Sequence, residues 1–139
     1  MKSEAEPVSL DEVVLRCIWG EYYDPALPLP IRDRAFAPRR DESDGISVFR
    51  LACVRLAEDV LTVFAESKRD SYGIAIVSVV DLAALGLSVA LSPIADIKGH
   101  AVIPELNADR CRVDKLWCDG IRKRLAVLAS ARMIRIPIA

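Results

Sequence analysis

The sequence predicts one α+β domain, built from a small mixed, mainly antiparallel sheet and about three helices. Apolar, β-branched runs follow one another closely between residues 73 and 103, as is typical of strands in one buried sheet. Two stretches outside that region repeat apolar residues at helical spacing. The length of 139 residues is that of one domain and suffices to bury a core without disulfides or metal ions.

The chain is expected to begin with a loose tail over residues 1–8 and a helix over residues 10–19. Ser9 and Glu12 form a capping-box pattern at the start of that helix. Its buried face would carry Leu10, Val14 and Cys17. Gly20 would end it.

Residues 20–45 form a proline-rich arm. The prolines at positions 25, 28, 30 and 38 rule out a regular helix. A connection of this length inside a domain is usually a functional loop or a segment that lies over the core. The Asp44-Gly45 pair predicts a turn that leads into a short strand over residues 46–50.

The remaining elements follow from apolar spacing and turn residues. The clearest predicted helix covers residues 53–67, with apolar residues at three- and four-residue steps. We expect strands at 73–80, 87–92 and 100–103, with a short helical turn before Gly86. A helix after Pro104 carries apolar residues from position 113 to 128, and Gly120 weakens it. A final alternating strand contains Pro137, which places it at a sheet edge.

Charge and cysteine content exclude several classes of function. The net charge of −1 gives no basic field for nucleic acid. No run approaches the roughly 20 apolar residues of a membrane span, and the acidic N-terminus is unlike a signal peptide. We therefore expect a cytoplasmic protein. Four cysteines without a CxxC pair, together with a single histidine, argue against a zinc site, so no metal or cofactor is predicted.

His100 is the first candidate for chemistry, because imidazole exchanges its proton near neutral pH. Ser47 is a candidate nucleophile, and Asp44 could complete the set. No GxSxG or SxxK pattern surrounds this serine. A structural histidine bonded to backbone and a turn serine are the interpretations that the sequence favours.

Two charged runs are the next candidates. Asp41, Glu42 and Asp44 crowd a short stretch beside Arg39 and Arg40, and such carboxylates could bind a divalent ion. The basic stretch 122–124 could contact phosphates. Solvated faces are the interpretation that we prefer for both runs.

The arm offers a different kind of site. Aromatic anchors on a stiff segment suit a protein–protein contact, although the arm could equally close the core. The candidate binding residues are Tyr22, Tyr23, Phe36, Arg39 and Arg50.

Six sequence pieces, in their order between about residues 13 and 128, resemble a family of small bacterial proteins of unassigned function. These pieces are VLRCIW at 14–19, Phe36-Ala-Pro38-Arg39, Asp44-Gly45-Ile46-Ser47-Val48, Tyr72-Gly73-Ile74-Ala75, LGLSV at 85–89 and His100-Ala101-Val102-Ile103. The shared pattern is F-x-P … D-G-[IL]-S-V … H-A-x-I. The resemblance implies a bacterial source and no particular reaction. By association, such proteins look like accessory members of conflict or defence gene clusters.

The sequence thus favours a non-catalytic function: a small cytoplasmic accessory protein that binds a larger protein through its arm. A second copy of the chain is an alternative partner, whereas nucleic acid and membrane are not expected. The opposing hypothesis is a small hydrolase or nuclease-like effector that uses His100 with Ser47 and Asp44. An open pocket that brings His100 within about 4 Å of either partner would favour the enzyme.

Overall fold

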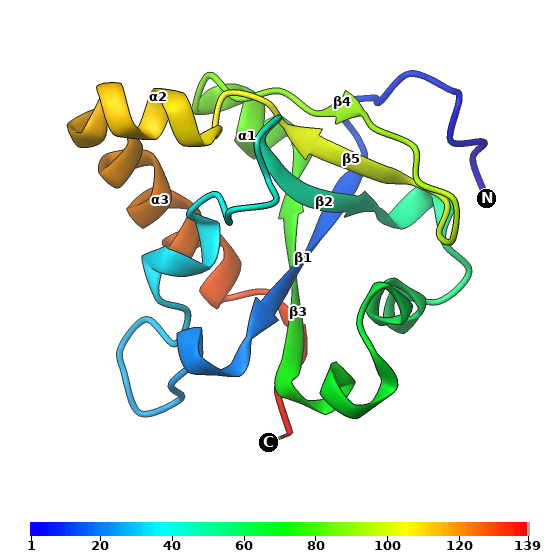
Figure 1. Ribbon diagram of the computed structural model, residues 1–139, viewed down its shortest axis with the longest axis horizontal. Coiled ribbons are helices and arrows are strands. Elements are labelled where there is room, and N and C mark those ends of the chain that lie inside the picture. Colours follow the sequence, from blue (N-terminus) through cyan, green and yellow to red (C-terminus); the bar gives the residue numbers. More distant parts are fainter. Residues whose placement is uncertain (139) are drawn as a thin grey trace.

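A six-stranded sheet in which every neighbouring pair of strands runs antiparallel organises the protein (Figure 1). The computed structural model describes residues 1–138. The expected α+β class is confirmed. The strands, in their order across the sheet, are β4 (Ala90–Leu91), β5 (His100–Ile103), β2 (Ile46–Arg50), β1 (Val13–Trp19), β3 (Tyr72–Ser78) and β6 (Met133–Arg135).

Three α-helices and a series of short 3-10 segments cover the sheet, so the helical elements are more numerous than expected. The helices are α1 (Val79–Ala84), α2 (Ala108–Val113) and α3 (Lys115–Ser130). The 3-10 segments are Gly20–Tyr22, Asp33–Phe36, Leu51–Cys53, Ala57–Val63 and Glu66–Ser71.

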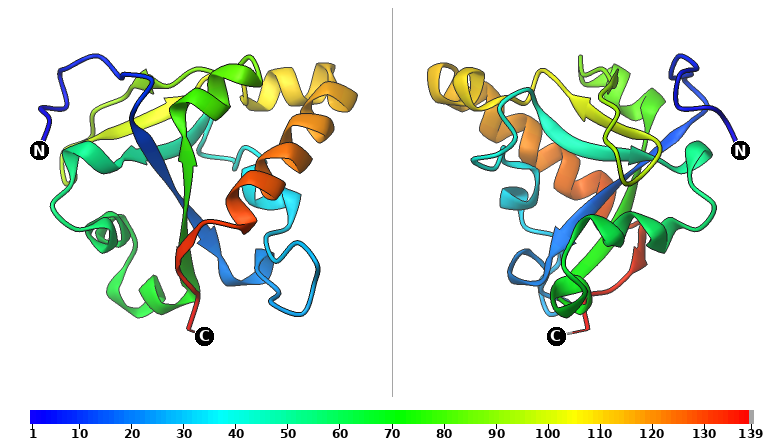
Figure 2. Two further views of the ribbon diagram at one scale, coloured as in Figure 1. Left: turned by 180° about the vertical axis from the view of Figure 1, so that it is seen from behind. Right: turned by 45° about the vertical axis from the view of Figure 1, so that its right-hand side comes forward.

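Each face of the sheet carries its own core. α1, α3 and the 3-10 segment Asp33–Phe36 pack on one face, where Val14 and Ile18 meet Leu125. The 3-10 segments of residues 51–71 cover the other face (Figure 2). Leu15 and Phe49 meet Val60 and Leu61 in the core on that face. Burial on both faces removes the alternation of polar and apolar residues from the central strands.

The helix predicted over residues 10–19 is wrong, because this segment forms β1. A central strand that is buried on both faces reads as a continuous apolar run, which periodicity cannot distinguish from a buried helix. The capping-box contact itself is present: the Glu12 carboxylate accepts the backbone N–H of Ser9 at 2.9 Å. It stabilises a turn that leads into a strand instead of a helix.

The predicted helix 53–67 is wrong as well. The chain there forms parts of three 3-10 segments, which extended residues at Val54 and Phe64 separate. The β-branched residues Val60, Thr62 and Val63 favour α-helix weakly. Of the strand expected over 87–92, only Ala90–Leu91 is a strand. β2, β3 and β5 lie close to their predicted positions. β6 pairs only with β3 and forms the predicted edge.

The N-terminal residues, expected to be a loose tail, are fastened to the domain. Arg50 is fully buried, and its guanidinium donates to the backbone oxygen of Glu6 at 2.7 Å. The same guanidinium binds the Glu12 carboxylate through two hydrogen bonds of 2.8 Å. Lys2 adds a backbone hydrogen bond to Ala52. Glu12 thus neutralises the buried guanidinium, whose remaining hydrogen bonds go to backbone oxygens of the tail.

Candidate active site

Ser47 and His100 lie on neighbouring strands and face each other. The register of β2 and β5 pairs Phe49 with His100 and Ser47 with Val102. Residues at these four positions share one face of the sheet, so Ser47 and His100 are diagonal neighbours. His100 Nε2 lies 3.1 Å from Ser47 Oγ. The two residues singled out from the sequence therefore meet within hydrogen-bond distance.

The backbone oxygen of Ser92 fixes the tautomer of the His100 ring. His100 Nδ1 lies 2.6 Å from the backbone oxygen of Ser92. A carbonyl oxygen only accepts, so Nδ1 carries the proton and donates it. In the neutral ring Nε2 is then the unprotonated nitrogen, and it accepts the hydrogen bond of the Ser47 hydroxyl. Ser92 also donates its own N–H to the backbone oxygen of His100 at 3.1 Å. Ser92 therefore contacts both the ring and the backbone of His100.

Glycines with positive φ precede both members of the pair. Gly45, at φ +133°, stands two residues before Ser47, and a side chain there would approach the backbone oxygen of Ile103 to 2.4 Å. Gly99, at φ +86°, directly precedes His100, and a side chain there would meet Cys53 at 2.7 Å. Only glycine combines this backbone conformation with so close an approach. The turn that was predicted at Asp44-Gly45 is the one that delivers Ser47 to the sheet.

A buried ion pair holds the backbone of Ser47 from both sides. Arg16 Nη1 lies 2.7 Å from Glu42 Oε2, and both side chains are almost fully buried. Arg16 Nη1 also donates to the Ser47 carbonyl at 2.8 Å. The Ser47 N–H donates to Glu42 Oε2 at 2.6 Å. The Arg39 N–H reaches the other oxygen of the same carboxylate at 2.9 Å, which fixes the arm beside the serine.

Glu42 is ionised despite its burial. Desolvation alone would raise the pKa of this carboxyl, but the Arg16 charge and the hydrogen bonds from Arg16, Ser47 and Arg39 outweigh it and lower the pKa. The carboxylate serves as a structural acceptor and is not available as a proton donor near neutral pH.

A pocket of about 210 Å³ opens in front of the serine–histidine pair. The 3-10 segment Ala57–Val63 and the residue after it form one wall, and the arm forms another. This volume is below the roughly 300–1,000 Å³ of usual drug-sized sites, so it suits a small ligand. The lining residues are Arg16, Cys17, Arg39, Asp41, Glu42, Ser47, Phe49, Val63, Phe64 and His100.

Asp44 does not contact Ser47 or His100, although it was the expected third member of the site. A backbone oxygen takes its place. The Asp44 side chain is exposed and lies outside the pocket, because the turn at Gly45 directs the chain onward to Ser47. The backbone oxygen of Ser92 takes the position beside Nδ1 that a carboxylate would otherwise occupy. Among Asp41, Glu42 and Asp44, only Asp41 and Glu42 reach the pocket.

The five candidate binding residues, four from the arm and Arg50 from β2, fall into different environments. Phe36 and Arg50 are buried, with 2% and 0% of their surfaces exposed, so neither side chain is open to a partner. Tyr22 and Tyr23 are half-buried and pack against the core. Arg39 lines the pocket. The arm therefore closes the core around Phe36, and its exposed apolar residues are Leu27 and Leu29 instead.

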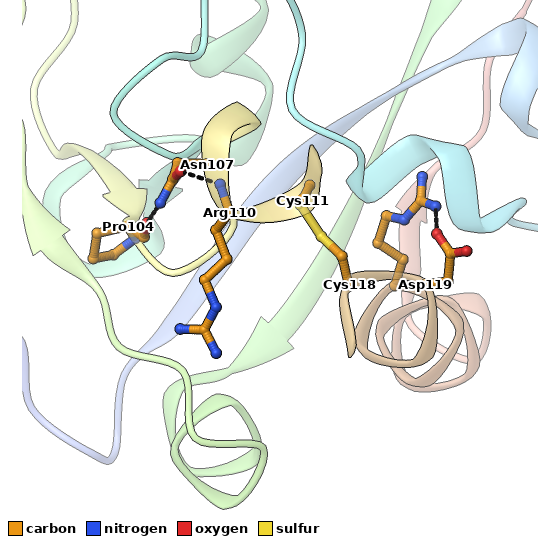
Figure 3. Close-up of a disulfide and its surroundings, with 7 residues drawn as sticks. Pro104, Asn107, Arg110, Cys111, Cys118 and Asp119 are labelled. Atoms are coloured by element: carbon orange, nitrogen blue, oxygen red, sulfur yellow. Dashed lines mark hydrogen bonds and ion pairs between the residues drawn. A yellow bond between two sulfur atoms is a disulfide. The ribbon is translucent and has the colours of Figure 1, made fainter. Parts of the chain in front are cut away.

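The cysteines divide into two kinds. Cys17 and Cys53 are buried free thiols, and burial raises the pKa of Cys17 to about 11. Cys111 and Cys118 form a disulfide that joins α2 to α3 (Figure 3), a pairing that the sequence analysis did not predict. Disulfides are typical of oxidising compartments, so the cysteines give no support to the cytoplasmic prediction.

The remaining candidates show no arrangement for chemistry. Lys123 and Arg124 are exposed on a solvated helix face, whereas Arg122 is partly buried and pairs with Asp119. Within residues 1–138, no cluster of three or more His, Cys, Asp or Glu side chains is placed to hold a metal ion. Over the same residues, no helix is both long and apolar enough to cross a bilayer.

Sequence reasoning missed Arg16 and Ser92. An arginine inside the apolar run VVLRCIW is a signal of a buried cation, but nothing in the sequence identifies Glu42, 26 positions later, as its partner. Ser92 acts through its backbone oxygen, which leaves no trace in residue type.

No family model, curated protein or solved structure matches the chain.

Proposed function

We propose that the protein is a small hydrolase that cleaves short acyl esters, with Ser47 as nucleophile and His100 as general base. The observation that carries this proposal is the 3.1 Å contact between Ser47 Oγ and Nε2 of His100, in a pocket open to small ligands. A nucleophile bonded to a base, with the base oriented by a third group, is the minimal arrangement for covalent acyl transfer.

The reaction would run in two halves. In the first, Ser47 Oγ attacks the acyl carbon while His100 Nε2 takes the hydroxyl proton, and Nε2 then protonates the leaving alcohol. In the second, Nε2 takes a proton from water, whose oxygen attacks the acyl–serine. Ser47 Oγ leaves and regains its proton from Nε2, and a carboxylic acid is released. The Ser92 carbonyl keeps the ring oriented and stabilises the imidazolium that forms in each half.

Cys17 also lines the pocket, but its raised pKa argues against it as the nucleophile. The thiolate is the reactive form of cysteine, and burial holds the pKa of Cys17 at about 11. Near neutral pH the thiol is therefore protonated and inert. Ser47 is half-exposed and already bonded to a base.

The hydrogen bonds of Ser47 also limit the expected rate. In many serine hydrolases the backbone N–H of the nucleophile helps to bind the oxyanion, but here that N–H is taken by Glu42. Loss of one such donor costs about 10²–10³ in kcat. Esters with good leaving groups, which need less stabilisation of the oxyanion, are the expected substrates.

The test is covalent labelling with a fluorophosphonate and hydrolysis of 4-nitrophenyl acetate. The wild type should be labelled on the peptide of residues 41–50, at Ser47, and should release 4-nitrophenol. Ser47→Ala should abolish both signals. His100→Gln should reduce them about 10²–10⁴-fold, the usual contribution of a general base.

Ser43→Ala is the matched control, because Ser43 lies on the same peptide, is exposed and does not line the pocket. It should keep the wild-type rates. A label on Ser43, or hydrolysis that survives Ser47→Ala, would contradict the proposal.

Protein binding through the arm remains a second proposed function. It is favoured by the exposure of Leu27 and Leu29 in the proline-rich loop and of Trp19 at its base. In this proposal the protein is an accessory member of a bacterial defence cluster and binds a larger protein. A cytoplasmic location belongs to the same proposal.

Affinity capture from the native host tests the second function. A partner that binds the arm should be retained by the wild type and lost from Leu27→Ser/Leu29→Ser. Ser47→Ala should retain it, because this change leaves the arm intact. A partner that is retained equally by all three proteins would count against the arm.

A further inference from the structure

We propose that Arg39 binds an anionic group of the substrate, so that the pocket selects small acyl esters that carry a carboxylate or a phosphate. The predicted effect on hydrolysis rests on the proposed function. The predicted binding of an anion depends only on the residues of the pocket.

The charges around the pocket leave Arg39 as the cation available to a ligand. Arg16 is buried and already paired with Glu42. Over residues 1–138, no carboxylate lies within 4.0 Å of the Arg39 guanidinium. Asp41 lines the same pocket but is exposed, so solvent screens its charge. An anion that enters the pocket therefore meets a guanidinium that no carboxylate contacts directly.

The backbone of Arg39 is anchored, and its guanidinium lies beside an aromatic ring. Its backbone N–H is bonded to the buried Glu42 carboxylate at 2.9 Å. Its guanidinium carbon stands 6.0 Å from the centre of the Tyr72 ring, and this ring stacks on Phe64 with centroids 3.7 Å apart. Phe64 itself lines the pocket. The guanidinium thus belongs to a wall that is built from aromatic rings.

The chemistry of the wall defines the ligand. A guanidinium presents a planar fork of donors that matches carboxylate and phosphate oxygens, and it keeps its charge at every physiological pH. The adjoining faces of Phe64 and Val63 are apolar. Together with the volume of about 210 Å³, they fit a compact molecule with one apolar part and one anionic end.

Binding is tested without turnover, on the folded Ser47→Ala protein. Benzoate and benzamide have nearly the same shape and differ in charge, and inorganic phosphate tests the other anion class. Titrations followed by backbone NMR shifts should show benzoate binding about tenfold or more tightly than benzamide, a preference that falls with salt. Phosphate binding without benzoate binding would assign the site to phosphate esters, and the reverse would assign it to carboxylates.

Arg39→Gln is the diagnostic variant, and Arg40→Gln is its control. Arg40 is the neighbouring cation, but it is exposed and does not line the pocket. Arg39→Gln should remove the preference for the anion, and Arg40→Gln should leave it intact. Equal affinity for benzoate and benzamide with no binding of phosphate, or an equal effect of the two substitutions, would overturn the inference.

Hydrolysis of 4-acetoxybenzoate and of its neutral methyl ester separates this inference from the proposed function. In the protein with an intact Ser47, the anionic ester should have the lower KM, and Arg39→Gln should raise that KM with little effect on the neutral ester. Anion binding without hydrolysis of either ester would refute the hydrolase alone. Hydrolysis of both esters with equal KM would refute the role of Arg39 alone.

Discussion

Arg16 and Glu42 form a buried ion pair that clamps the backbone of the candidate nucleophile. The guanidinium donates to the Ser47 carbonyl, and the carboxylate accepts the Ser47 N–H. β1 supplies the arginine, and the arm supplies the glutamate. The pair therefore joins the arm to the centre of the sheet at the residue where the reaction is proposed to occur.

Removal of one partner should be far more damaging than removal of both. Glu42→Leu leaves the Arg16 cation buried without a counter-charge, which costs about 3–5 kcal/mol of the free energy of unfolding. Arg16→Met combined with Glu42→Leu removes both charges and should lose clearly less than the sum of the two single changes. Urea unfolding of the four proteins measures this coupling.

Asp41→Asn is the control for the loss of a carboxylate in the same segment. Asp41 is exposed, so its free energy of unfolding should stay within about 0.5 kcal/mol of the wild type. Additive effects of the Arg16 and Glu42 changes would mean that the pair is not a coupled unit.

The sheet was predictable where side-chain pattern alone decides the structure. β3 and β5 are short β-branched runs bounded by turn residues, and Gly86 ends α1 with φ +78°, as expected. β1 was mistaken for a helix because its burial on both faces depends on the two layers packed against it. That information lies in residues far along the chain.

The candidate site was predictable in its members and not in its geometry. Serine and histidine are reactive residue types, which identified Ser47 and His100 as candidates. Their contact, however, depends on the register of β2 against β5. Asp44 was included because of its closeness in sequence, and the turn at Gly45 directs it away from the pocket. The roles of Ser92 and Arg16 come from a backbone oxygen and a distant ion pair, which residue types do not reveal.

Glu12 should make the fold sensitive to acid. The hydrogen bonds from Arg50 lower the pKa of Glu12 from 4.5 to about 2 and outweigh the effect of its burial. Because the pKa of the folded state lies below that of the unfolded state, the stabilisation is complete above pH 4.5 and is lost as the pH falls towards 2. The shift corresponds to about 3 kcal/mol.

Carboxyl ¹³C NMR of the wild type measures this titration directly, without a substitution. The Glu12 carboxyl shift should move near pH 2, and urea unfolding should show a loss of stability between pH 4.5 and 2. A Glu12 midpoint near 4.5 would contradict the role of Arg50.

The disulfide between α2 and α3 should stabilise the domain. It closes a loop with a sequence separation of 7, for which the chain-entropy estimate is about 2–3 kcal/mol. Protein purified without reductant should show two free thiols after denaturation, those of Cys17 and Cys53, and four after reduction. Cys111→Ser/Cys118→Ser should unfold at lower urea concentration, with no further effect of reductant. Four thiols before reduction would contradict the assignment.

The two glycines Gly99 and Gly86 allow backbone strain to be separated from steric overlap beside the active pair. Both have positive φ, at +86° and +78°, so alanine at either position pays about 1–2 kcal/mol for a left-handed conformation. A side chain at Gly86 meets nothing within 4 Å, whereas at Gly99 it meets Cys53 at 2.7 Å. Gly99→Ala should therefore destabilise the protein more than Gly86→Ala.

Gly99→Ala should also impair the site, because the new Cβ overlaps Cys53 and is attached to the residue directly before His100. The rate of fluorophosphonate labelling of Ser47, measured on folded protein, should fall in Gly99→Ala and stay unchanged in Gly86→Ala. Equal labelling of the two variants would show that the position of His100 does not depend on the close packing of Gly99 against Cys53. In that case the hydrogen bonds to Ser92 would be sufficient to hold the imidazole against the serine.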